Sequence, residues 1–462
     1  MPKVKIAIIG GGSYGWTFTI VRDLVVTGDL EGSTIVLQDI APETLKITGP
    51  LCRKVVKKSG RNFKIETTTS EAEALRGADF VILTISTGGF DTMEHDIGVP
   101  LKYGIYQSVG DTVGPGGISR ALRNIPVVVD IGKHMERLCP NAVMMNYTNP
   151  MSTLCRALTR ETSVPTIGLC HELFGAMNWL VKLFGLKDRH DFDVVAAGVN
   201  HCIWILKLTI KETGEDALAL LRQYLRNPKT FMKKRQAAVK SKTRARRMLA
   251  FAETHGGTNL VKSALFEAYG ALPAGGDRHV AEFFPFFLTE EADAGKKWGV
   301  HLTTVEERRT QWQPRALANC RKMLRGTMPI DMKRSGETIS LIIDAITGGE
   351  PFVDVMNLPN DGQISNLPLD ACVETMAIAD SNGARGLAVG DLPLGVQNQV
   401  MKHLLNQELT VEAALTGDRD LVLQAMLNDP LVRNLEDAKK MTKELLEANR
   451  KWLPRFFKKR GR

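Results

Sequence analysis

The sequence has no apolar run close to the roughly 20 residues that a membrane-spanning helix needs. Its start passes from Lys3 and Lys5 directly into an apolar stretch, Ile6–Ile9, and lacks the longer apolar region and small-residue cleavage site of a signal peptide. Internal repeats and low-complexity tracts are also missing. With 44% hydrophobic and 24% charged residues, the composition is that of a soluble globular protein. We expect a cytoplasmic protein that does not associate with a membrane.

Cysteine is too scarce for a disulfide framework. The chain has 7 cysteines, an odd number scattered through 462 residues, and most are expected to be small buried apolar residues. Cys170 is the exception, because His171 and Glu172 follow it immediately after the strand-like Thr166–Leu169. Three potential ligands or acid–base groups in a row at the end of a strand indicate chemistry rather than packing.

Basic segments lack the aromatic residues that often accompany them in nucleic-acid-binding proteins. The formal net charge is +9, with a concentration of Lys and Arg in Arg222–Arg247 and a further group in the tail Lys458–Arg462. Without interleaved aromatics or a known binding motif, these segments do not predict a nucleic-acid arm. We interpret Arg222–Arg247 as a solvated basic helix that assists anionic substrates or partners by long-range attraction.

A glycine-rich turn near the start predicts a dinucleotide site. The strand-like Lys3–Ile9 leads into a G-x-G-x-x-G pattern and then an apolar helix from about Phe18 to Val26, which is the context that the motif requires. The next strand, Thr34–Gln38, ends in Asp39, whose carboxylate can accept hydrogen bonds from a ribose and would repel a 2′-phosphate. We therefore predict NAD as the cofactor. The predicted NAD-binding residues are Gly10, Gly12, Ser13, Tyr14, Gly15, Asp39 and Gly88.

Further apolar runs alternate with helical segments and predict an α/β fold with a doubly wound parallel sheet. The predicted strands are Ala78–Ser86, Ala142–Tyr147 and Thr166–Leu169, and the helices between them are Leu122–Leu138 and Ser152–Arg160. Ligands of such sheets bind beyond the carboxyl ends of the strands. Asp39, Gly88, Asn149 and Cys170 all follow strand ends, so we expect them to line one crevice.

Two other segments carry polar groups suited to a site. The loop Gly110–Gly117, which contains Asp111, precedes a helix bearing Arg120 and Arg123, and a helix N-terminus can meet an anion or a sugar hydroxyl. The segment Gly275–His279 offers Asp277 or His279 as a base and Arg278 as a partner for a carboxylate. The alternative for this segment is a capped loop with a structural ion pair. An ordinary irregular connection is the alternative for the first loop.

The pair Cys170 and His201 forms the predicted metal site. His201 follows the strand-like Asp193–Val199 and stands between Asn200 and Trp204. Two protein ligands would leave coordination positions open for substrate oxygens, as a catalytic metal requires.

Taken in order, these motifs resemble glycoside hydrolase family 4, the NAD- and metal-dependent glycosidases. The matching stretches are Gly10–Gly15, Gly110–Gly117, Asn146–Pro150, Cys170–Glu172, Gly198–His201, Leu415–Arg419 and Asp429–Pro430. The resemblance implies a fold similar to lactate and malate dehydrogenases, with an NAD-binding Rossmann domain at 1–195 and an α+β substrate and oligomerisation domain at 196–462. It also implies a homo-oligomer, a dimer or tetramer.

The resemblance implies redox-assisted elimination as the mechanism. NAD⁺ would take hydride from C3 of the sugar, a base would remove the acidified C2 proton, the C1 substituent would leave, and water and hydride would then add back. A divalent cation, usually Mn²⁺ in this family, would polarise the C2 and C3 oxygens. By the match, Cys170 and His201 bind the metal, Asn149 holds a sugar hydroxyl and Asp277 is the base. The general acid stays open among His171, Glu172 and Asp111.

The Cys-His-Glu sequence resembles that of the α-galacturonidases within the family, because phospho-sugar members carry Asn or Asp after the metal cysteine. A uronide substrate would suit the cations of Arg120, Arg278, His279 and His171. The alternatives are an α-glucosidase, α-galactosidase or α-glucuronidase of the same family. A malate-type 2-hydroxyacid dehydrogenase is a further alternative, and an NAD-sensing or nucleic-acid-binding protein ranks last.

Overall fold

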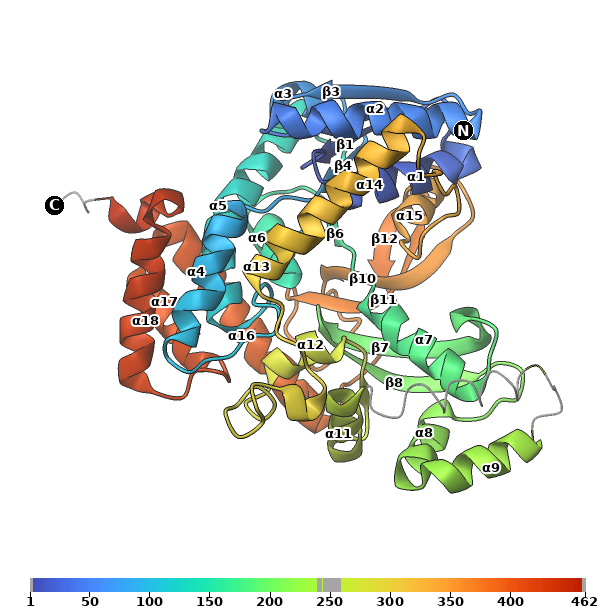
Figure 1. The fold of residues 1–462 in the computed structure, drawn as a ribbon, viewed down its shortest axis with the longest axis vertical. Helices are drawn as coiled ribbons and strands as arrows, with labels where there is room; N and C mark the ends of the chain where they lie inside the picture. The colour runs from blue at the N-terminus through green and yellow to red at the C-terminus, as the bar shows by residue number, and fades with distance from the viewer. Residues whose placement is uncertain (1–2, 239–242, 244–258, 459–462) are drawn as a thin grey trace.

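The computed structural model describes residues 3–238, 243 and 259–458. These residues build one sheet of 12 strands in the order β3-β2-β1-β4-β5-β6-β10-β11-β7-β8-β9, with β12 paired to β11 (Figure 1). The strands are β1 Lys5–Ile9, β2 Thr34–Gln38, β3 Lys64–Thr68, β4 Phe80–Leu83, β5 Val143–Asn146, β6 Thr166–Gly168, β7 Phe192–Val199, β8 Cys202–Ile210, β9 Leu272–Pro273, β10 Phe352–Pro359, β11 Cys372–Asp380 and β12 Gly383–Gly386.

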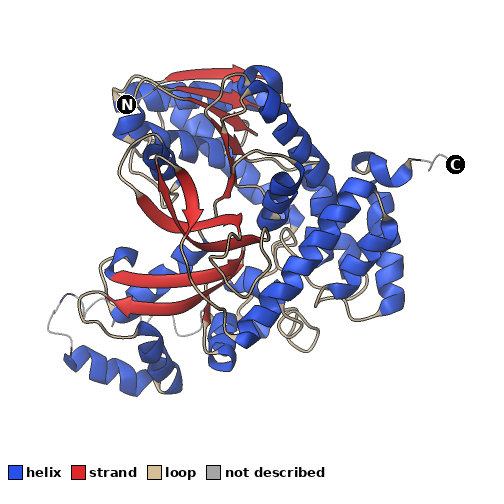
Figure 2. Cartoon of the chain, turned by 180° about the vertical axis from the view of Figure 1, so that it is seen from behind, coloured by secondary structure: helices blue, strands red, loops and turns tan. Residues whose placement is uncertain are grey.

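Helices lie on both sides of this sheet, as Figure 2 shows. They are α1 Trp16–Val26, α2 Pro42–Ser59, α3 Glu71–Leu75, α4 Gly89–Leu101, α5 Gly114–Leu138, α6 Met151–Glu161, α7 Glu172–Phe184, α8 Ala217–Arg226, α9 Pro228–Ala238, α11 Leu260–Tyr269, α12 Asp277–Val280, α13 Val305–Glu307, α14 Gln313–Arg325, α15 Ile339–Ile346, α16 Leu394–Thr416, α17 Arg419–Asn428 and α18 Leu435–Ala448. A π-helical turn, Arg308–Trp312, joins α13 to α14.

The first half of the sheet is parallel and buried on both faces. Alternate residues of β1 point into different cores, because side chains alternate across a strand. Ile6 and Ile8 pack in a cluster with α1, α2, α14 and α15, whereas Ala7 and Ile9 pack with α3, α5 and α6. The predicted doubly wound parallel sheet is therefore confirmed, and β2 has the predicted bounds Thr34–Gln38.

The second half of the sheet is antiparallel and continues directly from the first. Asn357 of β10 pairs with Gly168 of β6, and β11 then pairs with β7. A Cβ on Gly168 would lie 2.7 Å from that of Asn357, so a glycine fits this close junction. The predicted domain boundary between 195 and 196 falls within β7. It stays a prediction.

The structure corrects the predicted loop at Gly110–Gly117. Helix α5 begins at Gly114 rather than near Leu122, so the second half of that segment is the first turn of a helix. Pro115 suits the first turn because its missing N–H has no partner to lose there. Gly117 is required by packing, since a Cβ there would lie 2.5 Å from the carbonyl carbon of Thr112.

The basic segment is described only in part. Residues up to Ala238 form α8 and α9, as the prediction of a basic helix suggested, and Arg235 pairs with Glu215. Residues 239–242 and 244–258, with most of the remaining basic residues, lie outside the described residues, as does the tail 459–462. Within the described chain, none of the helices combines the length and apolarity needed to cross a bilayer.

A buried ion pair supports the loop that follows β4. The guanidinium of Arg123 donates to both carboxylate oxygens of Asp96, at 2.8 and 2.6 Å, and the two side chains are 1% and 0% exposed. Arg123 also donates to the carbonyl of Thr87, next to the predicted cofactor residue Gly88. Arg123 was expected near the site only because its helix follows the loop Gly110–Gly117, and the structure gives it this supporting role.

We expect Arg123→Ala to lower the free energy of unfolding by about 3–5 kcal/mol, because it leaves the Asp96 charge buried without a partner. The matched control is Arg309→Ala, which removes a 39% exposed arginine paired with Asp91 and Glu94 and should cost about 1 kcal/mol or less. Urea unfolding of both variants measures the difference, and similar losses would contradict the expectation.

Candidate active site

The glycine-rich turn packs too tightly to accept side chains at Gly10, Gly11 and Gly12. Gly10 has φ +92°, and a Cβ there would lie 2.3 Å from the carbonyl oxygen of Thr84. At Gly12 a Cβ would lie 1.9 Å from Oγ1 of Thr44. Gly15 is different, because no atom would lie within 4 Å of its Cβ. The turn is therefore closed towards the sheet and open beside the start of α1.

This open side has the features of a dinucleotide cradle. Helix α1 begins at Trp16 with Gly15 at its N-cap, and the N-terminus of a helix can meet a pyrophosphate. Asp39 accepts hydrogen bonds from Gly12 N and Ala41 N, both at 2.9 Å, which holds its carboxylate at the end of β2. The remaining lone pairs can accept from ribose hydroxyls. The residues present fit NAD.

The other predicted cofactor residues lie around the same turn. Ser13 Oγ accepts from Trp16 N at 3.3 Å, and the carbonyl of Tyr14 accepts from the Cys320 thiol at 3.4 Å. Gly88 has φ +85° and caps the N-terminus of α4.

A cleft of about 230 Å³ lies next to this turn. Predicted site residues from five separate segments meet in it: Asp111, Asn149, Cys170, His171, Glu172, His201, Arg278 and His279. Residues that the sequence analysis did not predict for the site also line it, namely Trp16, Val109, Tyr147, Met151, Leu169, Arg308 and Trp312. The convergence at the carboxyl ends of β5 and β6 follows the rule for open α/β sheets.

His201 lies in the tight turn between β7 and β8, with φ +66°. Its Nδ1 lies 2.8 Å from the Thr112 hydroxyl, and that hydroxyl donates to Oδ1 of Asp111, also at 2.8 Å. Since the hydroxyl has only one proton to donate, we assign a hydrogen to Nδ1 of His201. Burial and the neighbouring His279 lower the pKa of His201 to about 3. The ring is neutral, and its Nε2 keeps a lone pair for a ligand.

Asp111, His201 and His279 form a group that could hold a metal ion. One potential ligand atom from each lies within 4.8 Å of the others, and the two imidazole rings are 3.8 Å apart. Burial opposes ionisation of Asp111, but His279, His201 and Arg120 lower the pKa of its carboxyl to about 2. Nδ1 of His279 is buried without a partner in the described part of the chain. One carboxylate and two imidazoles suit a divalent cation.

Cys170 lines the same cleft but does not belong to that group. Burial raises the pKa of its thiol well above the usual range, and the nearby carboxyl groups of Glu374 and Glu172 act in the same direction. The side chain of Asn200 hydrogen-bonds to the thiol. The predicted pair of Cys170 and His201 stays a prediction, and Asp111 and His279 are further potential ligands beside His201.

Glu172 and His171 occupy different electrostatic environments. Glu172 accepts a hydrogen bond from Gly276 N, and its Oε1 lies 3.9 Å from Nε2 of His279. Burial raises the pKa of Glu172, but its neighbours, chiefly His279 and His201, lower it by more, so the pKa lies below its usual value and the carboxyl group is ionised. His171 is half exposed, and its Nδ1 lies 3.3 Å from Glu337. Hydrogen bonding to Glu337 raises the pKa of His171 and favours the imidazolium.

Two predicted residues stand outside the cleft lining. Asp277 accepts from Val261 N at 3.0 Å and Lys262 N at 3.3 Å, so it caps α11. Burial raises its pKa against the opposing effect of Lys262. Arg120 donates from Nε to the carbonyl of Asn149 at 3.0 Å, behind the cleft wall. The Asn149 side chain itself is available, because its Oδ1 is buried without a partner among the described residues.

Buried carboxyl groups from the second half of the chain hold the Asp111 loop. Glu282 accepts from Val109 N and Gly110 N, both at 2.8 Å, and burial raises its pKa to about 8. Asp429 accepts from Gly114 N at 2.8 Å. In the sequence, Asp429 was recognisable only as part of a family motif.

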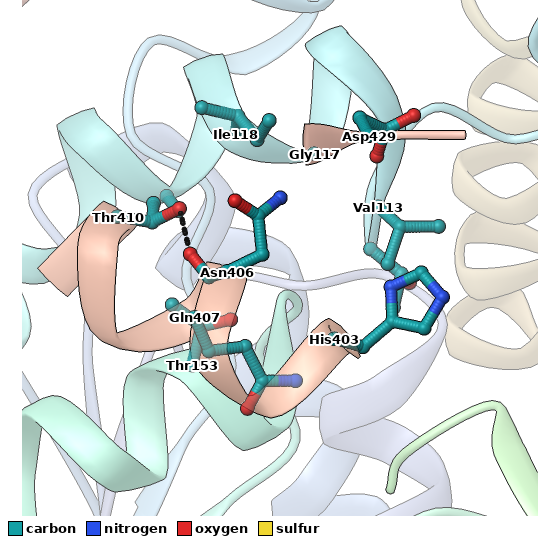
Figure 3. A pocket seen from close by; sticks show the side chains of 11 residues that line it. Val113, Gly117, Ile118, Thr153, His403, Asn406, Gln407, Thr410 and Asp429 are labelled. Carbon is teal, nitrogen blue, oxygen red and sulfur yellow. Dashed lines mark hydrogen bonds between the residues drawn. The ribbon is translucent and has the colours of Figure 1, made fainter. Parts of the chain in front are cut away.

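A small cavity lies behind this loop, between the start of α5 and α16 (Figure 3). Val113 and Asp429 face His403 and Asn406 across it. Its volume of about 20 Å³ exceeds the ~10–15 Å³ that a water molecule needs. His403 Nε2 and Asn406 Oδ1 are buried without partners in the described part of the chain, and both residues line the cavity. The cavity is a packing feature and does not extend the cleft.

Some site residues gave little signal in the sequence. Trp16 follows the glycine motif directly, and that position is the sequence signal that could have placed it beside the cleft. Arg308 and Trp312 belong to a helical turn far from every motif, and Glu374 is an internal residue of β11. Glu374 is fully buried, accepts from Asn200 Nδ2 at 3.5 Å, and has its pKa raised to about 8 by burial.

Family models match most of the chain. Residues 5–186 match the family 4 glycosyl hydrolase model, and residues 196–432 match the model of the C-terminal domain of that family. An α-galacturonidase from Thermoanaerobacterium saccharolyticum is 37% identical over 463 residues, which cover 97% of this chain and 96% of the relative.

Solved structures show the same fold. A putative glucosidase from Bacillus subtilis has a TM-score of 0.84 at 33% identity and covers 96% of this chain and 100% of its own. A 6-phospho-α-glucosidase from gut microorganisms in complex with NAD and Mn²⁺ has a TM-score of 0.78 at 22% identity, covering 98% and 99%. A lactate dehydrogenase from Eimeria maxima reaches 0.50 at 15% identity, covering 90% and 96%. The predicted similarity in fold to the dehydrogenases is confirmed.

Because Thr112 orients His201, we expect Thr112→Val to weaken Mn²⁺ binding by about 10–100-fold while NAD binding changes little. Calorimetric titration with Mn²⁺ measures the change. Thr159→Val is the control, since its hydroxyl donates only to the carbonyl of Arg156 within α6. Unchanged Mn²⁺ affinity in Thr112→Val would show that His201 is not a ligand positioned by this bond.

Proposed function

The chain belongs to family 4 of the glycosyl hydrolases, and from this membership we propose that it hydrolyses α-galacturonides with NAD⁺ and a divalent cation. The predicted family resemblance is thereby confirmed. The observation that carries the proposal is the cleft in which Asp111, Cys170, Glu172, His201 and His279 meet beside the dinucleotide cradle. Curated relatives named α-galacturonidase, 37% identical to this chain, support the choice of substrate.

We propose Asp111, His201, His279 and Cys170 as the residues that hold the cation, and the turn Gly10–Gly15 with Asp39 as the site of NAD. When bound, NAD would supply hydride transfer from and back to C3 of the sugar, and the cation would supply polarisation of the C2 and C3 oxygens. The donor set suits Mn²⁺, which is present with NAD in the solved structure of the 6-phospho-α-glucosidase.

The protein side chains divide the proton transfers according to their ionisation. We propose that His171 donates a proton to the leaving group, because the pKa of its imidazole is raised by Glu337. Glu172 and Asp111 have lowered pKa values, so they are ionised and cannot serve as acids near neutral pH. Asn149 would accept a hydrogen bond from a sugar hydroxyl through its unpartnered Oδ1.

Asp277 remains our proposed base for the C2 proton. Its pKa is raised by burial, and a stronger base results when the carboxylate is destabilised. Arg278 and His279, the next two residues, line the cleft. The role requires that the Asp277 carboxylate release the amides of Val261 and Lys262 when substrate binds. We also propose a homo-oligomer acting in the cytoplasm.

Hydrolysis of an α-galacturonide carrying deuterium at C2 should release the label into water, because the C2 proton is removed before the glycosidic bond breaks. The measurement is NMR of the product formed with NAD⁺, Mn²⁺ and a reductant. A product that keeps all of its label would rule out C2 deprotonation. Net formation of NADH in proportion to product would instead indicate a dehydrogenase. Matched α-galactosides and 6-phosphoglycosides in the same assay test the substrate class.

The affinity for Mn²⁺ should rise about tenfold for each pH unit between pH 6 and 8. The raised pKa keeps the Cys170 thiol protonated in this range, so binding must expel its proton, and a higher pH makes that easier. His201 and Asp111, with pKa values of about 3 and 2, lose no proton there.

Cys170→Ser should reduce this pH dependence and lower the affinity, while NAD binding is retained. Cys139→Ser, at the C-terminal end of α5, is the control for loss of a buried thiol. Calorimetry at several pH values measures the slope, and a flat profile in the unchanged protein would remove Cys170 from the set of ligands.

A further inference from the structure

One cation in the cleft lacks a partner of its own. Arg308 begins the π-helical turn Arg308–Trp312 and lines the cleft. Its Nε is buried without a hydrogen-bond partner, and its side chain makes no ion pair with any residue that the structure describes. Its guanidinium lies 5.5 Å from the centre of the Trp312 ring, which limits its orientation.

The other arginines near the cleft are already engaged. Arg278 donates to the Thr303 hydroxyl and, at 3.5 Å, to the carbonyl of Ser108. Arg120 donates to the carbonyl of Asn149, and Arg123 forms the buried pair with Asp96. Nε of Arg278 is also buried without a partner among the described residues, but its guanidinium is held by these bonds. Arg308 is the arginine of the described cleft lining whose side chain makes no hydrogen bond.

The charges around Arg308 leave it short of a counter-ion. Arg278 and Arg120 are close enough to disfavour its charge, whereas Asp111 and Glu282 favour it. Burial raises the pKa of Glu282 to about 8, so that carboxyl is mostly neutral at pH 7. Asp111 belongs to the group proposed to hold the cation, and its charge would then be shared with the metal. Arg308 is half-buried, and an anion offsets the hydration that a partly buried guanidinium loses.

We propose that Arg308 binds the carboxylate of the substrate and thereby selects uronides over neutral glycosides. This inference rests on the proposed function and names the residue that sets its specificity. A planar guanidinium can hold a carboxylate through two parallel hydrogen bonds. The hydroxymethyl group of a neutral sugar has no charge to offer, so its binding would leave Arg308 buried and unpaired. Discrimination is strong when the wrong ligand leaves a buried polar group unsatisfied.

The test compares Arg308→Gln and Arg308→Lys with the unchanged protein on a matched α-galacturonide and α-galactoside. Arg308→Gln should lower kcat/KM for the galacturonide by on the order of 10²-fold, with a much smaller change for the galactoside. For Arg308→Lys, kcat/KM for the galacturonide should lie between the values of Arg308→Gln and the unchanged protein, because lysine keeps the charge but not the two parallel hydrogen bonds. Arg309→Gln is the control, since this neighbour of Arg308 is directed to the surface ion pairs with Asp91 and Glu94.

Binding provides a readout that is independent of turnover. Calorimetry with free galacturonate and free galactose should show that Arg308→Gln loses affinity for galacturonate only. Equal losses for both sugars, or an unchanged preference for the galacturonide in Arg308→Gln, would overturn the role of Arg308. If the unchanged protein instead prefers 6-phosphoglycosides or neutral glycosides, the proposed function itself fails, and the role of Arg308 in uronide selection fails with it.

Discussion

The Thr112 hydroxyl makes the hydrogen bonds on which the candidate active site depends. It connects Asp111, from the loop before α5, to His201, from the hairpin between β7 and β8. These segments belong to different halves of the sheet, so the group of potential metal ligands exists only where the halves meet. Glu282 holds the same loop from the other side through two backbone amides. A buried polar network of this kind fixes one arrangement when its members are satisfied.

The features that could be predicted from the sequence are those encoded over short stretches. Strand β2 has its predicted bounds because an apolar run ends sharply at Asp39. The turn Gly10–Gly15 was recognisable because its context, a strand before and a helix after, is contiguous in the chain. Asn149 and Cys170 were predicted to share a crevice because both follow strand ends, which is a rule of topology rather than of local pattern, and both line the cleft.

The features that could not be predicted depend on contacts between distant residues. Helix α5 begins at Gly114, eight residues before the predicted helical segment Leu122–Leu138. Its first turn is rich in glycine, which helix propensity disfavours but which packing against the Asp111 loop requires. Asp277 stands in a charged segment, and its hydrogen bonds to amides of α11, a separate element, left no sign in that segment. Arg308 had no motif around it. It stands out only in the structure, because the neighbouring arginines make side-chain hydrogen bonds and Arg308 makes none within the described chain.

The unbroken sheet also limits how this protein can move. Strand β6 is hydrogen-bonded to β10, and β11 to β7, so the parallel and antiparallel halves share one framework. Hinge closure of two domains concentrates its rotation in a few connecting residues, and here such rotation would break ladder bonds next to the cleft. Conformational change on ligand binding must therefore be confined to loops and side chains. The width of the cleft, rather than the swing of a domain, then sets the size of the aglycone that can be accommodated.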